Sequence, residues 1–362
     1  MVDLFFELLQ VALGNRDRLS RTPSEKEWYE LFSMSEKQSV GAFVFTALDS
    51  LSQAGQKPPI DLLMEWFDLS EQVKTQNALM NQEAARLTRL FEQAGHKTAI
   101  LKGQANARLY PQAWSRQPGD IDIWVDGGRK KVTATTQALG MQNPTASYHH
   151  LHLPKNENGV DVEVHFRPSS GNRNPFTNKP LQQYLEKEIS SDCLLVEEGF
   201  RVPSLRFAIV MQLAHIQRHL LSEGVGLRQV IDFYYLLKSD DQNQRSNVSH
   251  RLSSFGIDHI AGALMWLLHE KLGLEEQYLI APMDEQRGEM LFQAILEGGN
   301  FGHYYLEGQE QGFWRRKYAK HKHRFQMLLF NPSEVLSIEL DWILFFLKTI
   351  PQRIQNRTLS LE

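Results

Sequence analysis

Two aspartates, Asp120 and Asp122, alternate with isoleucine in the stretch Gly119-Asp120-Ile121-Asp122-Ile123-Trp124-Val125. In a β-strand, side chains two positions apart project to the same face, so the alternation predicts that both carboxylates point the same way. Two carboxylates this close repel each other unless a cation lies between them. Mg²⁺ prefers such oxygen ligands and shares them with substrate phosphates. The stretch therefore predicts metal-dependent phosphoryl chemistry; the alternative is an exposed strand face with two solvated acids.

A second polar strand face follows about forty residues later. The segment from Val160 to Phe166 alternates, with three valines on one face and Asp161, Glu163 and His165 on the other. The segment from Tyr148 to Leu153 also alternates, and the residues between the two are rich in turn formers. We therefore expect a β-hairpin.

The elements that position these residues fall into three regions. Residues 1–95 have the periodicity of helices, including a stripe from Met80 to Ala94 that ends at Gly95. Residues 96–204 alternate short strands and helices. Residues 205–362 are helical again. We predict an N-terminal helical region, an α/β core and a C-terminal helical domain with these boundaries.

Composition restricts the class of protein. The chain has 362 residues with 42% hydrophobic and 23% charged residues, which is ordinary for a soluble protein. The net charge of −4 gives no support for nucleic acid as a partner, although residues 315–324 form a basic run that is either a contact surface or a solvated helix face. The single cysteine indicates a reducing compartment, and every apolar run is too short to cross a membrane. We expect a cytoplasmic protein without a membrane span.

The order of the motifs resembles a known family. A strand that ends at Lys102-Gly103 is followed by the aspartate stretch, by Val162-Glu163-Val164-His165-Phe166-Arg167, and by the helical segment His215-Ile216-Gln217-Arg218-His219 with Gly226-Leu227-Arg228 and Asp232. This order is similar to that of the uncharacterised nucleotidyltransferase family within the polymerase-β-like superfamily. The resemblance covers roughly residues 60 to 240.

The resemblance implies an α+β fold, in which a small mixed sheet with helices forms a polymerase-β-like core between two helical regions. In such a core, a turn glycine cradles the phosphates of a nucleoside triphosphate, which places Gly103 at that turn. Asp120 and Asp122 become ligands of Mg²⁺ or Mn²⁺. Glu163 becomes the third acid, with Asp161 as its competitor on the same face.

Other residues are candidates for phosphate binding. The family carries a serine or glycine after the turn glycine, whereas this chain has Gln104, so Lys102 or backbone N–H groups would have to replace the missing hydroxyl. Arg116 precedes the first aspartate by four residues and could neutralise triphosphate charge through its guanidinium fork. The alternatives are a surface lysine at the strand end and a solvated loop arginine.

Several further residues could assist. His165 is a candidate for supporting the metal ligands, contacting substrate, or simply being a satisfied histidine. Two pairs on helices, His215 with His219 and Arg228 with Asp232, have four-residue spacing. They either close over the acceptor side of the cleft or form a hydrogen-bond network between helices.

The leading hypothesis is a nucleotidyltransferase that moves a nucleoside monophosphate from a triphosphate to a hydroxyl of a small molecule, a saccharide or a protein. A second hypothesis, favoured by Gln104, is a non-catalytic module that binds a nucleotide or a partner. A third is a metal-dependent hydrolase, because the hairpin would bring His150 and His152 near Glu163 and His165, and such ligands suit transition metals.

Overall fold

The computed structural model describes all residues except 142–143, 192, 240–241, 300–320, 323 and 357–362. Most of the basic run at 315–324 therefore lies outside the described residues. A five-stranded sheet has the strand order β1-β2-β5-β4-β3. Its strands are β1 (Thr98–Ile100), β2 (Ile121–Val125), β3 (Thr145–Ala146), β4 (His150–Leu153) and β5 (Val162–His165).

The sheet is mixed because one of its pairings is parallel. β2 runs parallel to β5, whereas β1–β2, β4–β5 and β3–β4 are antiparallel. The expected hairpin is confirmed: β4 and β5 pair with His150 opposite His165 and His152 opposite Glu163. A separate two-stranded ribbon joins β6 (Leu194–Leu195) to β7 (Arg201–Val202). The mixed sheet among many helices confirms the predicted α+β fold.

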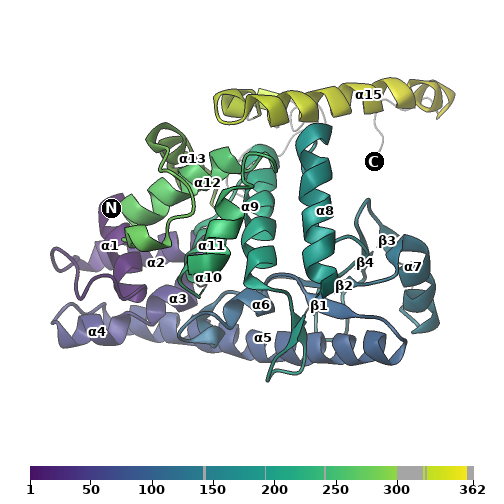
Figure 1. The fold of residues 1–362 in the computed structure, drawn as a ribbon. Coiled ribbons are helices and arrows are strands. Elements are labelled where there is room, and N and C mark those ends of the chain that lie inside the picture. Colours follow the sequence, from purple (N-terminus) through teal and green to yellow (C-terminus); the bar gives the residue numbers. More distant parts are fainter. Residues whose placement is uncertain (142–143, 192, 240–241, 300–320, 323, 357–362) are drawn as a thin grey trace.

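One face of the sheet is buried against α5 (Ile60–Gln93), and this burial fixes the direction of the acids. Isoleucines and valines of β2 and β5 form one core with the helical stripe that includes Met80, Leu87 and Phe91. Because strand side chains alternate, packing Ile121 and Ile123 into this core turns Asp122 to the opposite face. α5 extends from the sheet to the N-terminal helices, along one side of the molecule (Figure 1).

The N-terminal and C-terminal helical regions pack against each other. α1 (Val2–Ala12), α2 (Glu25–Lys37), α3 (Gly41–Phe45) and α4 (Leu48–Gln53) share one hydrophobic core with the C-terminal helices. The rings of Phe6 and Phe292, for example, lie 5.1 Å apart. The division at residues 95 and 204 stays a prediction.

The remaining helices include two that flank the sheet, α6 (Gln104–Ala107) and α7 (Gly128–Ala138). The others are α8 (Pro175–Ser191), α9 (Leu205–Ser222), α10 (Leu227–Ser239), α11 (Gln242–Ser249), α12 (Asp258–Trp266), α13 (Glu285–Gly298) and α15 (Pro332–Asn356). Short turns lie at η1 (Ala113–Ser115), η2 (Leu267–Lys271), η3 (Glu276–Tyr278) and η5 (Met327–Leu329). Among the described helices, none combines the length and apolar character that crossing a bilayer requires.

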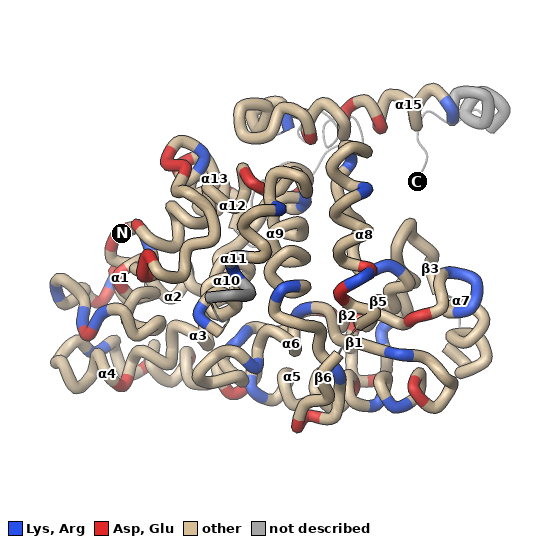
Figure 2. Tube along the Cα trace, in the orientation of Figure 1, with Lys and Arg blue, Asp and Glu red and all other residues tan. Residues whose placement is uncertain are grey.

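Charged residues of both signs are interspersed along the described trace (Figure 2). Single-sign charge is confined to short segments, such as the basic first turn of α7 and the two acids of α1. Two acidic residues, Asp122 and Glu163, face each other where β2 and β5 pair.

Candidate functional site

Asp122 and Glu163 are direct neighbours on the parallel strands β2 and β5. Asp122 is almost fully buried, whereas the Asp120 side chain keeps 38% of its surface exposed. The strand begins at Ile121, so Asp120 precedes β2 rather than lying within it. All three carboxylates nevertheless line one cavity. The structure thus brings together the three acids that the sequence selected.

Lys102, at the end of β1, lies between the two aspartates. Its Nζ atom is 2.9 Å from Asp122 Oδ2 and 3.7 Å from Asp120 Oδ1. Burial acts to lower the pKa of Lys102, but the neighbouring carboxylates outweigh it and raise the pKa to about 12. A permanent positive charge therefore offsets the repulsion between the acids, and Lys102 is not a surface lysine.

His165 joins the acids from β5. Its Nε2 atom lies 3.0 Å from Asp122 Oδ1 and 3.2 Å from Glu163 Oε2. Burial opposes protonation, yet hydrogen bonds to both carboxylates raise the pKa of His165 to about 9. Asp122, Glu163 and His165 each offer a ligand atom, and these atoms lie within 4.8 Å of one another. This group has the composition of a cation site.

Two further histidines, His149 and His150, extend the group. His150 Nδ1 is 3.3 Å from Glu163 Oε2 and 3.1 Å from His149 Nε2. Burial, together with the charge of His165, lowers the pKa of His149 to about 2, so its ring is neutral. His152 is more distant, with Nδ1 at 3.9 Å from Glu163 Oε1. The sequence had singled out His150 and His152 but not His149.

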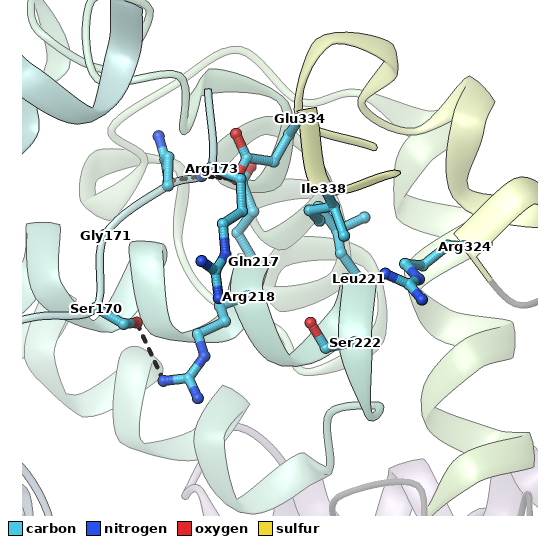
Figure 3. A pocket seen from close by; sticks show the side chains of 11 residues that line it. Ser170, Gly171, Arg173, Gln217, Arg218, Leu221, Ser222, Arg324, Glu334 and Ile338 are labelled. Carbon is cyan, nitrogen blue, oxygen red and sulfur yellow. Dashed lines mark hydrogen bonds between the residues drawn. The ribbon is translucent and has the colours of Figure 1, made fainter. Parts of the chain in front are cut away.

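The acids and histidines face a cavity of about 270 Å³. Its wall includes Arg218 from α9 and Ser170 from the loop after β5. The same two residues also line a neighbouring cavity of about 160 Å³ that reaches α15 (Figure 3). Arg218 Nη1 donates a hydrogen bond to Ser170 Oγ at 3.0 Å. Arg218 therefore lies at the junction of two adjoining cavities, a placement that no local sequence signal indicated.

The turn after β1 requires a glycine. Gly103 has φ of +65°, and a Cβ there would sit 3.4 Å from the backbone oxygen of Asp120. The glycine therefore allows β1 to end close to the acidic strand. The side chain of the next residue, Gln104, is buried and donates to Asn81 Oδ1 of α5 at 2.7 Å. Its amide is engaged with α5, so a phosphate role for Gly103 and Gln104 stays a prediction.

Arg116 is placed differently from the sequence-based expectation. Its guanidinium is buried and pairs with Asp232 of α10 through two hydrogen bonds, Nε to Oδ1 at 2.7 Å and Nη2 to Oδ2 at 2.8 Å. Tyr110 donates a further hydrogen bond to Oδ1 at 2.8 Å. The fork that was expected to meet a triphosphate is occupied by Asp232, and Arg116 is not a solvated loop residue either.

Arg228, like Arg116 and Asp232, helps to hold the loop that leads into β2. Its Nη1 donates to the carbonyl oxygens of Gln117 at 3.2 Å and Pro118 at 3.1 Å. From the opposite side, Asn77 of α5 donates to the carbonyl oxygen of Arg116 at 2.8 Å. Arg228 and Asp232 therefore hold the segment that delivers Asp120, and both also line a small cavity of about 20 Å³ beside Gly103 and Asp120. A role for them at the acceptor side of the cleft stays a prediction.

The remaining candidates divide between the cavity and the surface. His215 and His219 of α9 line the main cavity with ring centroids 4.3 Å apart, and burial lowers the pKa of both. Asp161 pairs with Lys155 at 3.2 Å and is not among the residues that line the cavity. Of the two competing acids, Glu163 is the one beside Asp122.

Comparison with known proteins identifies the family of the chain. The model of the uncharacterised nucleotidyltransferase family matches residues 24–273. The chain belongs to this family. The members' shared name supports a general nucleotidyl transfer function, and such enzymes generally use divalent metals.

A solved structure, described as an antigenic nucleotidyltransferase-like protein from Paracoccidioides brasiliensis, resembles part of the chain. It is 14% identical and covers 60% of this chain and 97% of its own length, with a TM-score of 0.34. None of the curated proteins compared with the chain matches it.

Proposed function

We propose that this chain transfers a nucleoside monophosphate from a nucleoside triphosphate to an acceptor hydroxyl, with Mg²⁺ or Mn²⁺ held by Asp120, Asp122 and Glu163. Membership of the family supports the reaction class. The observation that carries the proposal is the parallel pairing of β2 with β5, which sets Glu163 directly beside Asp122 in a cavity that Asp120 also lines.

The donor set fits such an ion. Three carboxylates from two segments face one cavity, and hard oxygen ligands of this kind are those that Mg²⁺ prefers. When bound, the ion would lower the pKa of the acceptor hydroxyl and neutralise charge on the transferred phosphoryl group. Asp120 and Asp122 would hold it, and Glu163 would complete the set.

Lys102, Glu163 and Arg218 would each have a different role in this reaction. Lys102 presents a buried ammonium beside the acids and can bind a phosphate oxygen as a point charge. Glu163 is the carboxylate placed to take the proton of the acceptor hydroxyl. Arg218 is the guanidinium at the junction of the two cavities, where it can orient an anionic group of the nucleotide or acceptor.

Partners and location follow as part of the proposal. We infer that the acceptor is a small molecule, a saccharide or a protein, and not nucleic acid, because the net charge is −4 and described charges of both signs are interspersed. A cytoplasmic location is proposed from the single cysteine, which suits a reducing compartment.

The first experiment is calorimetric titration of the four nucleoside triphosphates, each with and without Mg²⁺ or Mn²⁺. We expect at least one triphosphate to bind only with the divalent ion, and Asp122→Asn to abolish that binding. Asp161→Asn is the matched control, because its carboxylate pairs with Lys155 outside the cavity. Ion-independent binding, or equal effects of the two substitutions, would count against the proposal.

A non-catalytic binding module is the second candidate, and one observation favours it. The side chain of Gln104 points into α5, so the turn offers no side-chain hydroxyl to a phosphate. This candidate predicts nucleotide binding without release of pyrophosphate. A pyrophosphate-release assay across mixed acceptor classes separates the two, since product formation requires turnover.

A further inference from the structure

The histidines of the β4–β5 hairpin form a group that the proposed transfer reaction does not use. We propose that His149, His150 and His165, with Glu163, form a transition-metal site for an ion such as Zn²⁺ on the hairpin side of the cavity. This inference goes beyond the proposed function, and it does not depend on nucleotide binding.

The spacing of the ligand atoms carries the inference. His149 Nε2 and His150 Nδ1 are 3.1 Å apart, and Glu163 Oε2 lies 3.3 Å from His150 Nδ1 and 3.2 Å from His165 Nε2. Four-coordinate Zn²⁺ with bonds of about 2.0–2.1 Å separates neighbouring ligand atoms by about 3.3–3.4 Å. Three of the six edges of such a tetrahedron are therefore matched to within a few tenths of an ångström. The three histidines form one group of ligand atoms within 4.8 Å, and Glu163 adjoins it through His150 and His165.

The chemistry of the ligands selects the kind of ion. Each of the three histidines offers a ring nitrogen, and these atoms lie within 4.8 Å of one another. Imidazole nitrogen is a ligand of zinc, copper, iron and nickel, whereas Mg²⁺ takes oxygen ligands. The three histidines are thus matched to a different class of ion from the two aspartates, and Glu163 lies next to both groups.

An unsatisfied polar atom is a second, independent observation. His165 is 4% exposed, and its Nδ1 atom has no hydrogen-bond partner among the described residues. A buried polar atom without a partner carries a desolvation cost. Coordination of an ion by Nδ1 would remove that cost and leave Nε2 beside Asp122 and Glu163, whereas an ion on Nε2 would replace those two contacts.

The backbone holds the ligands in place. The β4–β5 register sets His150 opposite His165. His149 precedes β4, but its carbonyl oxygen accepts hydrogen bonds from the backbone of Phe166 at 3.1 Å and of Arg167 at 3.2 Å. Ligands on paired strands keep their spacing better than ligands on free loops. The site is therefore assembled by the sheet itself.

The test uses metal alone. The full chain, stripped with a chelator and free of nucleotide, is titrated with Zn²⁺ against a colorimetric chelator, and with Co²⁺ while visible absorption is recorded. We expect one equivalent of Zn²⁺ and the intense Co²⁺ bands of a four-coordinate site. His149→Gln and His150→Gln should each weaken Zn²⁺ binding by about 10-fold or more, the size of effect known for residues that support a metal.

His152→Gln is the matched control. It lies on the same strand, its side chain is 47% exposed, and it is absent from the group of ligand atoms within 4.8 Å. Circular dichroism verifies that each variant is folded. Absence of stoichiometric Zn²⁺ in the unmodified chain, or equal weakening by all three substitutions, overturns the inference.

A further variant separates this inference from the proposed function. Asp120→Asn should retain Zn²⁺ binding and the Co²⁺ spectrum, because Asp120 is not among those ligand atoms, while losing the Mg²⁺-dependent binding of nucleotide. If nucleotide never binds, the transfer reaction fails but the Zn²⁺ titration still decides the histidine site. If Zn²⁺ fails to bind, the nucleotide titrations are unaffected.

Discussion

Two buried clusters of opposite charges, both built from described residues, differ in what their members face. We call the first cluster the loop clamp. In it, Asp232 accepts hydrogen bonds from Arg116 and Tyr110. In the second, Lys102 and His165 meet Asp122 at the wall of a cavity of about 270 Å³. Both clusters join segments distant in sequence, but the cavity that Arg116 and Asp232 help to line holds only about 20 Å³.

The difference shows how to distinguish a structural charge from a functional one. A buried charge that is fully paired holds elements together, and removing one partner leaves the other uncompensated. A buried acid that is paired but lines a cavity of about 270 Å³, as Asp122 does, keeps access to a ligand. We therefore assign positioning to the loop clamp and ligand binding to the cavity cluster, and four substitutions test that division.

Asp232→Ala should have the largest effect on stability. It leaves the Arg116 guanidinium buried without its carboxylate, which should lower the free energy of unfolding by about 3–5 kcal/mol. Urea denaturation measures this change. The double variant Arg116→Met with Asp232→Leu should recover most of the loss, and a loss below about 1 kcal/mol in Asp232→Ala would contradict the role of the clamp.

Asp122→Asn should reduce catalysis more than stability. Once the donor and acceptor are known, we expect kcat to fall by about 10²–10³-fold, the usual cost of removing one group that stabilises developing charge. The unfolding free energy should fall by less than in Asp232→Ala, because Lys102 keeps Asp120 as a neighbour. Unchanged kcat would show that the cavity cluster is as structural as the clamp.

Arg218→Gln tests the junction of the two cavities. Loss of a charge-assisted contact costs about 1.5–3 kcal/mol, so KM for nucleotide or acceptor should rise by about 10-fold or more. Arg206→Gln is the control on the same helix, since Arg206 pairs with Glu188 at 3.6 Å and does not line either cavity. Equal KM values in the two variants would remove Arg218 from the site.

Lys155→Ala should have the smallest effect. It breaks the exposed pair with Asp161, and exposed pairs contribute about 0–1 kcal/mol to stability. Urea denaturation should therefore give almost the value of the unmodified chain. A loss of stability comparable to that of Asp232→Ala would contradict the prediction that the exposed Lys155–Asp161 pair contributes less than the buried Arg116–Asp232 pair.

The sequence predicted what depends on local alternation. The two-residue period put Asp120 and Asp122 on one face, and turn formers after Leu153 predicted the hairpin. It could not reveal the parallel pairing of β2 with β5, because that pairing depends on packing both strands against α5. Only the family resemblance implied that Glu163 would stand beside the aspartates.

Local sequence patterns could not predict contacts between residues that are far apart in the chain. Arg116 is separated from Asp232 by 116 residues, so its position before an acidic strand suggested a phosphate contact instead of a clamp. Arg218 was overlooked because nothing in its local sequence indicates a function. It is an exposed residue on a mostly buried helix, and only the fold shows that two cavities meet at its side chain.

The position of Lys102 has a consequence for how the acids receive an ion. Its ammonium already neutralises Asp122 at 2.9 Å, so the carboxylates are drawn together by a tethered cation that belongs to the chain. A divalent ion bound by these carboxylates would compete with this ammonium, so its measured affinity would include the cost of displacing Lys102. The displaced Lys102 would then be available to an anion bound with the metal, which would couple binding of the ion to binding of the triphosphate.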